Sequence, residues 1–248
     1  MIKLKMPPFH IIIATVIDIF LLPIGLVLTG LYWVHDCFRI KPKFNPKKRN
    51  ILLLHGSGFN RAEWFLSNYY LRDYNVFSIN YAGLLSNNDC DGVDDYAKGK
   101  VRDEILAIKK LTGSNNISIL GHSMGGLIAS YYNENSALTD GVFVDKIISI
   151  STPWYGSSFI DKCGLKSKRY KQMSVNSSFL IELRSSIEKN KLMGRLTEYY
   201  CVGSESDFIV GHNSALLEDR CKYVTKYVGH YGVIASPCVW RMVLKWLN

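Results

Sequence analysis

Motifs that bind structural metals are missing from this sequence. Its six cysteines follow neither a Cys-x-x-Cys spacing nor a cysteine–histidine ligand spacing, so no zinc site is expected. A chain of 248 residues can bury a stable core without disulfides. We therefore predict reduced, mostly buried thiols, although an even number of cysteines permits disulfides. The cysteines are Cys37, Cys90, Cys163, Cys201, Cys221 and Cys238.

The sequence also lacks any signature of nucleic-acid binding. Its 30 Lys and Arg residues exceed its 21 Asp and Glu residues, for a formal charge of +9, which suits nucleic acid, an anionic membrane surface or solubility alone. The basic residues concentrate at residues 39–49 and 162–171. Neither cluster has zinc-finger spacing, an RNA-binding motif or a long basic helix, so we expect no nucleic-acid partner.

A long hydrophobic run occupies residues 11–34. As a helix of about 24 residues it would span the hydrocarbon core of a bilayer. Tyr32 and Trp33 at its C-terminal edge suit an aromatic belt, and the basic cluster that begins at Arg39 suits anionic headgroups. We predict a single-span membrane anchor with a basic linker over residues 1–45.

Two alternatives to a single span stay open. Asp18 is costly in the middle of a span, and a break at Pro23 and Gly25 would give a re-entrant or surface-lying hairpin. A cleavable signal peptide needs a shorter apolar region and a small-x-small site, which residues 30–33 do not offer. More basic residues follow the run than precede it, so the positive-inside rule predicts that the rest of the chain is cytoplasmic.

Residues 46–248 alternate short apolar runs with helical patterns. This alternation predicts one α/β domain, with a mostly parallel sheet covered by helices on both faces. Residues 154–195 interrupt it, because they are polar, rich in Ser and Lys and too long for a simple connection, which predicts a cap-like or lid-like insertion. The predicted strands are residues 51–54, 76–79, 117–120, 146–150, 198–202 and 223–228; the predicted helices are residues 63–70, 93–111, 124–132 and a C-terminal helix that buries Val239, Met242, Val243 and Trp246.

Ser123 is the centre of the motif Gly121-His122-Ser123-Met124-Gly125. An apolar strand run precedes it and a helix-forming stretch follows, which is the strand–turn–helix setting of a nucleophile elbow. In so sharp a turn, side chains at Gly121 and Gly125 would collide with neighbouring backbone. The amide end of the following helix would favour developing negative charge. We predict that Ser123 is a nucleophile.

A nucleophilic serine needs a histidine base, and the base needs an orienting acid. After a nucleophile elbow the expected order is serine, acid, histidine, with acid and base on loops after later strands. Only His212 and His230 follow Ser123, and His230, directly after the last predicted strand, is the predicted base; His212 is expected at the surface or in a supporting position. Asp207 is the predicted acid and Glu205 the alternative, unless Asp207 merely caps a turn.

The oxyanion hole of such a site comes from two backbone amides. One belongs to Met124, and the other to the loop His55-Gly56-Ser57-Gly58 after the first predicted strand. Ser57 is the predicted donor of this loop and Gly58 the alternative. His55 is expected to shape the loop rather than to transfer a proton.

Five motifs follow one another along the chain: His55-Gly56-Ser57-Gly58, Gly121-His122-Ser123-Met124-Gly125-Gly126, Ser151-Thr152-Pro153, Gly203-Ser204-x-x-Asp207-x-x-Val210 and Gly229-His230. Together they resemble the lipase and carboxylesterase branch of the α/β-hydrolase superfamily, in particular its small triacylglycerol-lipase-like members. The resemblance covers roughly residues 50–248 and implies an α/β-hydrolase fold, a Ser-His-Asp triad, and neither a metal nor an organic cofactor. The stretch from Gln172 to Leu183 resembles the segment near the acyl pocket of those enzymes. The chain departs from larger relatives by starting at what would be their third strand and by carrying the N-terminal apolar run.

The predicted chemistry is two-step acyl transfer on carboxylic esters through an acyl-enzyme. The predicted anchor, the basic residues 162–171 and the apolar residues of the insertion favour lipid or other lipophilic acyl esters. Thioesters and amides stay open as substrates, because the same triad cleaves them. A membrane-tethered binding protein on a retired hydrolase fold would usually have lost a triad member or an elbow glycine, and this chain keeps them all. A proenzyme from which the anchor is removed is a further alternative.

Overall fold

The computed structural model describes residues 16, 18, 44–82 and 91–248. The predicted membrane anchor therefore lies outside the described residues, apart from Val16 and Asp18, as do most of the basic linker, Cys37 and Cys90. Among the described residues, no helix combines the length and apolar character that crossing a membrane requires. The division into anchor, linker and catalytic domain stays a prediction.

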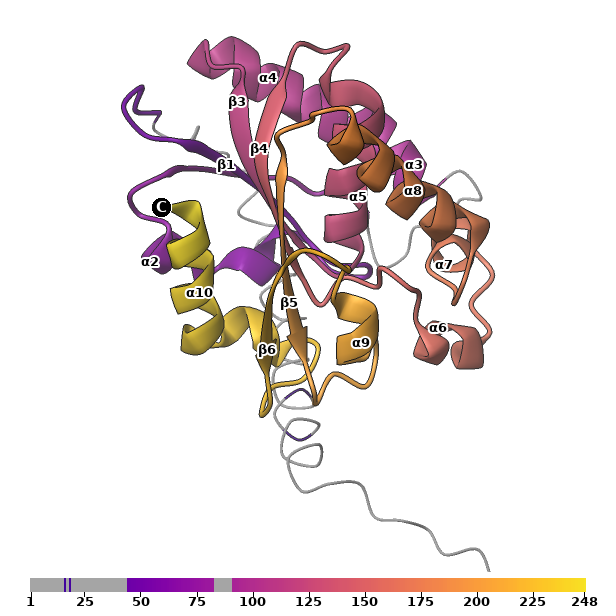
Figure 1. Cartoon of the computed structure of the whole chain (residues 1–248). Coiled ribbons are helices and arrows are strands. Elements are labelled where there is room, and N and C mark those ends of the chain that lie inside the picture. Colours follow the sequence, from indigo (N-terminus) through magenta and orange to yellow (C-terminus); the bar gives the residue numbers. More distant parts are fainter. Residues whose placement is uncertain (1–15, 17, 19–43, 83–90) are drawn as a thin grey trace, which may run out of the picture.

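A parallel sheet forms the centre of the described chain (Figure 1). Its strands lie in the order β2-β1-β3-β4-β5-β6, and every neighbouring pair is parallel. All carboxyl ends therefore meet at one edge, where loops of consecutive strands come together. The strands are β1 (Asn50–Leu54), β2 (Asn75–Ser78), β3 (Asn116–His122), β4 (Phe143–Ile150), β5 (Glu198–Ser204) and β6 (Cys221–Thr225).

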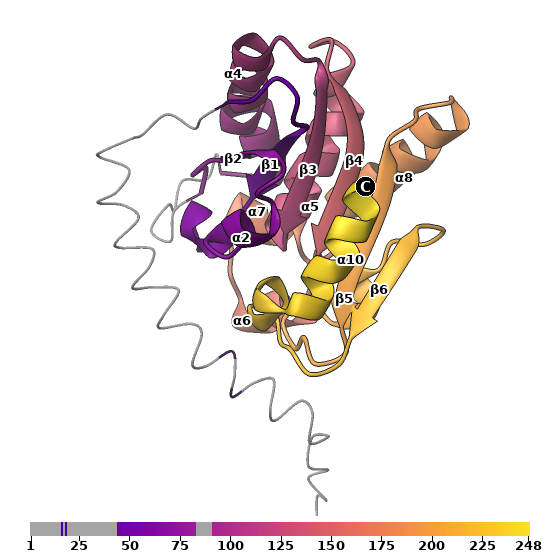
Figure 2. The same ribbon diagram turned by 90° about the vertical axis from the view of Figure 1, so that its left-hand side faces the viewer.

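Helices cover both faces of the sheet, as Figure 2 shows with α10 on one side and α4 and α5 on the other. The α-helices are α2 (Ser67–Tyr70), α3 (Val93–Tyr96), α4 (Arg102–Thr112), α5 (Met124–Tyr132), α6 (Ser158–Cys163), α7 (Lys168–Gln172), α8 (Ser178–Leu192), α9 (His212–Ala215) and α10 (Pro237–Leu247). The 3₁₀ helices are η1 (Arg61–Trp64) and η4 (Gly232–Ala235), and the π-helices are η2 (Ala97–Val101) and η3 (Asn133–Ala137).

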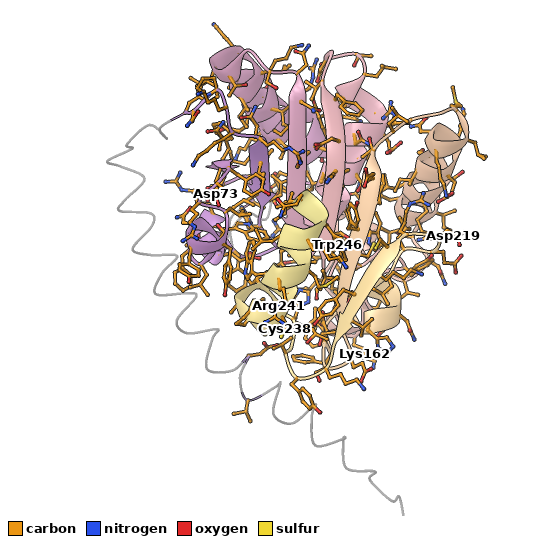
Figure 3. The ribbon with its side chains drawn as sticks, turned by 60° about the vertical axis from the view of Figure 1, so that its left-hand side comes forward. Asp73, Lys162, Asp219, Cys238, Arg241 and Trp246 are labelled. Carbon is orange, nitrogen blue, oxygen red and sulfur yellow. The ribbon has the colours of Figure 1, made fainter. Side chains whose placement is uncertain are left out.

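The strand β1 shows why a continuous apolar run makes a central strand. Successive side chains of a strand point to opposite faces, so Leu52 and Leu54 enter the core beneath α3, α4, α5 and α8, whereas Ile51 and Leu53 enter the core beneath α10 and η1. All four side chains are buried. Figure 3 shows Trp246 between α10 and the sheet, where its ring stacks on Tyr200 at a centroid distance of 5.0 Å.

The predicted helix over residues 93–111 is broken into α3, η2 and α4. The break is at Gly99, whose φ of −98° and ψ of −111° are not helical. Glycine carries no Cβ to penalise that backbone conformation. The apolar pattern continues across the break, because Val93 and Ala97 before Gly99 and Val101 and Ile105 after it are all buried. The hydrophobic pattern alone therefore could not predict the break.

The last predicted strand ends earlier than expected, because β6 stops at Thr225 instead of reaching residue 228. Beyond it, the backbone carbonyls of Lys226 and Val228 accept hydrogen bonds from the Ser206 and Ser204 hydroxyls. Ser204 is the last residue of β5 and Ser206 lies in the loop that follows it. Side chains at the end of β5 therefore take acceptors that a longer β6 would have used.

The insertion over residues 154–195 contains α6, α7 and α8. Trp154, Leu180 and Leu183 are buried in the core cluster that also holds α5. Part of the insertion is therefore built into the domain. Its role as a cap or lid stays a prediction.

The prediction of mostly buried thiols is wrong for the described cysteines. Cys163, Cys221 and Cys238 are exposed free thiols and only Cys201 is buried. The reason is position: Cys201 lies within β5, between two strands, whereas Cys163 ends α6, Cys221 begins the edge strand and Cys238 lies in the first turn of α10.

Candidate active site

Ser123 lies in a sharp turn between β3 and α5. Its φ of 52° and ψ of −122° are strained for a residue other than glycine. A Cβ on Gly121 would lie 2.4 Å from the backbone carbon of Gly125, and one on Gly125 would lie 2.3 Å from the Leu54 carbonyl oxygen. Side chains at these two positions would therefore collide with backbone, as predicted. Because glycine has none, α5 can begin directly against β1.

Asp207 and His230 come together at the carboxyl edge of the sheet. Asp207 Oδ2 accepts a hydrogen bond from His230 Nδ1 at 2.8 Å, and the amides of Ile209 and Val210 both donate to Asp207 Oδ1 at 3.0 Å. Asp207 is 4 % and His230 3 % exposed. Burial raises the pKa of Asp207, but the charge and hydrogen bond of His230 outweigh it and hold the pKa below its usual value.

The two alternatives to these residues lie elsewhere. Glu205 faces Lys226 across 3.9 Å, and its amide donates to the Thr225 carbonyl. His212 begins α9 and is partly exposed. The structure thus brings Asp207, and not Glu205, to His230.

His122 links the elbow to the loop of His230. Its Nε2 donates to the His230 carbonyl at 2.9 Å, and the two imidazole rings lie 4.8 Å apart. Because His122 directly precedes Ser123, this contact holds the His230 loop next to the nucleophile elbow. Within the described part of the chain, neither the Ser123 hydroxyl nor His230 Nε2 has a hydrogen-bond partner.

The structure brings Met124 and the loop after β1 to the nucleophile. Met124 is the first residue of α5, and the amide of a first helical residue has no acceptor inside its helix. A Cβ on Gly56 would lie 3.2 Å from the Ser123 Cβ, so the loop after β1 runs directly past the nucleophile. His55 Nδ1 donates to the Gly56 carbonyl at 2.8 Å. Because N–H and C=O point in opposite directions across a trans peptide, the Ser57 amide points away from His55.

Two acidic side chains near the site were not predicted to take part in it. Glu63 contacts His122 Nδ1, and its side chain is 1 % exposed. Asp18 Oδ1 accepts a hydrogen bond from the Gly232 amide at 2.9 Å, next to the His230 loop. A lone acid within an apolar run was the only sequence signal for Asp18, and Glu63 gave none, because its partner is distant in sequence.

Asp18 also explains a glycine beside the base. A Cβ on Gly229 would lie 2.0 Å from Asp18 Oδ2, so only glycine admits the carboxylate there. Asp18 is 4 % exposed, so its carboxyl group is buried beside the loop of the base.

Comparisons with known proteins agree with this architecture. The model of the alpha/beta hydrolase family matches residues 51–182, which is more than half of the chain. The chain belongs to the α/β-hydrolase family. The predicted resemblance and the predicted α/β-hydrolase fold are thereby confirmed, and membership supports a hydrolase activity.

Solved structures of two lipases and an esterase resemble this one in fold. The mature lipase BlEst2 of Bacillus licheniformis has 16 % identity and a TM-score of 0.68, covering 85 % of this chain and 96 % of that one. Lipase B of Aspergillus fumigatus has 20 % identity and a TM-score of 0.63, covering 83 % and 54 %. The naproxen esterase of Bacillus subtilis has 14 % identity and a TM-score of 0.52, covering 82 % and 84 %. No curated protein sequence matches the chain.

Proposed function

We propose that this α/β-hydrolase is a serine esterase with Ser123 as nucleophile, His230 as base and Asp207 as orienting acid. The observation that carries the proposal is the buried 2.8 Å hydrogen bond between Asp207 and His230, held beside the strained turn of Ser123. A buried carboxylate on Nδ1 leaves Nε2 as the nitrogen for proton transfer.

The reaction proceeds in two acyl-transfer steps. Ser123 Oγ forms a bond to the ester carbonyl carbon while its proton moves to His230 Nε2, and Asp207 stabilises the resulting imidazolium. The Met124 and Ser57 amides donate to the oxyanion. The tetrahedral intermediate collapses, and the alcohol leaves with the proton from His230. Water then attacks the acyl-enzyme by the same proton path, releasing the acid and restoring Ser123.

For the substrate we propose lipophilic acyl esters. Phe159 on α6 and Phe208 next to Asp207 form an edge-on pair with centroids 5.7 Å apart, and both rings are well exposed. Exposed aromatic rings beside the acid loop suit an apolar acyl chain. Lys162, also on α6, lies toward the end of the molecule where β5 and β6 finish (Figure 3). Membrane association through the apolar run at residues 11–34, with the enzyme on the cytoplasmic side, belongs to the same proposal. Because Asp18 of that run hydrogen-bonds the Gly232 amide, we propose the surface-lying form of the run rather than a span across the bilayer.

A fluorophosphonate probe tests the nucleophile. Wild type should be labelled and Ser123→Ala should not, because the probe phosphonylates only an activated serine hydroxyl. Ser114→Ala, at the amino-terminal end of β3, is the matched control and should label like wild type. Undiminished labelling of Ser123→Ala would overturn the assignment.

The same probe and a substrate series separate the finer proposals. Labelling should appear in the membrane fraction of cells that express the full chain, and a soluble-only signal would contradict the anchor. Nitrophenyl esters of increasing acyl length should be cleaved faster as the chain grows. Activity on the acetate alone would contradict a lipophilic substrate, and faster cleavage of matched thioesters would move the assignment to a thioesterase.

A further inference from the structure

Glu63 and His122 form a second buried acid–histidine pair behind the triad. Glu63 belongs to η1 and His122 ends β3. Their side chains are 1 % and 0 % exposed, and Glu63 Oε1 contacts His122 Nδ1. The proposed mechanism gives neither side chain a proton to transfer.

The hydrogen bonds of the pair define where its protons lie. His122 Nε2 faces a carbonyl oxygen, that of His230, at 2.9 Å, so Nε2 must carry hydrogen. Glu63 Oε2 accepts from the Gly56 amide at 2.9 Å, which favours the ionised carboxylate. The Glu63 carboxylate then contacts a protonated His122 at Nδ1, and the pair is an imidazolium–carboxylate ion pair.

The electrostatic balance agrees with this assignment. Burial raises the pKa of Glu63, but the charge and hydrogen bond of His122, together with the charge of His55 and the Gly56 amide, lower the pKa of the carboxyl group overall. Burial lowers the pKa of His122, but the charge of Glu63 and its hydrogen bond raise the pKa of the imidazole overall. Each charge is therefore stable in the core only because the other is present.

The pair connects the three loops that the proposed mechanism uses. Glu63 fixes the amide of Gly56, one peptide before the predicted oxyanion donor Ser57. His122 adjoins Ser123 and fixes the carbonyl of His230. A pair of apolar side chains would fill the same space without directing any of these backbone groups.

We propose that Glu63 and His122 are positioning residues, which hold the oxyanion loop and the His230 loop in register with Ser123. The inference rests on the proposed function of Ser123, His230 and Asp207. The pair has no net charge, so it orients the loops without opposing the second imidazolium that forms on His230 during each acyl transfer. A small displacement of either loop lowers the rate of acyl transfer, whereas it hardly changes the affinity for the ester.

The test is the steady-state cleavage of a nitrophenyl ester by full-length Glu63→Gln. We expect kcat to fall by about 10²-fold with little change in KM, because reacting groups are misplaced while the binding surface is kept. Glu63→Asp keeps the charge and should recover part of the loss. The matched control is Glu134→Gln, which removes another buried carboxylate, one that accepts from Tyr199 and Asn190; it should keep the wild-type kcat.

A double variant keeps the test valid if Glu63→Gln does not fold. Glu63→Gln with His122→Asn removes both charges and leaves no unpaired ion in the core. Its kcat should fall well below that of wild type. Where Glu63→Gln and His122→Asn both fold as single variants, the double variant should have a kcat no lower than the poorer of the two, because the residues act as one unit. A wild-type kcat in Glu63→Gln or in the double variant, or a loss confined to KM, would overturn the inference. Failure of wild type to label with the fluorophosphonate would instead overturn the proposed function.

Discussion

Two buried acid–histidine pairs lie side by side at the carboxyl edge of the sheet, and they differ in what surrounds the histidine. His122 uses both ring nitrogens, one on Glu63 and one on the His230 carbonyl. His230 uses Nδ1 on Asp207, whereas its Nε2 has no hydrogen-bond partner among the described residues. His122, with both ring nitrogens in contact with protein oxygens, can only fix the position of its neighbours. His230, with Nε2 available, can accept and release a proton.

The two pairs also sit in different parts of the fold. Glu63 and His122 lie in η1 and at the end of β3, whereas Asp207 and His230 lie in loops after β5 and β6. The Glu63–His122 pair, which lies in regular secondary structure, can therefore anchor the Asp207–His230 pair, which lies in loops. Its hydrogen bond to the His230 carbonyl is the physical connection between them.

The largest expected difference between the pairs is in catalysis. Asp207→Asn should lower kcat by about 10⁴-fold, as removal of the orienting acid does in such triads, compared with about 10²-fold for Glu63→Gln. The Ile209 and Val210 amides hold Oδ1 of residue 207, so the asparagine would turn its NH₂ toward His230 and favour the wrong tautomer. Ester cleavage by the two variants measures the contrast, and equal losses would remove the distinction.

The dependence of stability on pH separates the pairs next. The folded-state pKa of Glu63 is lowered, so its stabilisation is present above its unfolded value and is lost as pH falls through the folded pKa. The folded-state pKa of His122 is raised, so its stabilisation is present below its unfolded value and is lost as pH rises through the folded pKa.

Wild type should therefore have its greatest advantage over Glu63→Gln, about 3 kcal/mol, between the unfolded pKa of Glu63 and the unfolded pKa of His122, and should lose it as pH falls through the lowered pKa of Glu63 or rises through the raised pKa of His122. Thermal unfolding from acidic to alkaline pH measures this advantage, which should shrink at both ends. Asp207→Ala serves as the comparison, because the pKa of Asp207 is also lowered and its contribution should be lost on the acid side. An advantage of the same size at every pH would contradict the ion pair.

The smallest expected effect concerns a third carboxylate, that of Asp18, beside the Asp207–His230 pair. Asp18→Ala removes the acceptor of the Gly232 amide and should destabilise the protein by about 1 kcal/mol, with a several-fold slower probe labelling. Asp18→Asn keeps the oxygen acceptor and should label nearly like wild type. Equal labelling rates in all three proteins would show that residue 18 does not support the His230 loop.

Local patterns predicted much of the fold and of the site. Five of the six strands overlap their predicted ranges nearly completely and α5 matches its predicted range, because a buried strand or helix carries its apolar pattern within a few residues. The elbow was predictable for the same reason: its glycines, serine and flanking elements are adjacent in sequence. The break at Gly99 and the early end of β6 were not predictable, since one depends on a single backbone conformation and the other on serines at the end of β5 and just beyond it.

The sequence by itself determined Ser123 in its strand–turn–helix setting and the order of acid and base after it. It left Asp207 and Glu205 both open, because two acids in one loop look alike until the loop folds. Only the tertiary structure decided that Asp207 meets His230 and that Glu63 meets His122. The physical reason is that a buried charge is stabilised by the partner that folding brings to it, and that partner can come from any point of the chain.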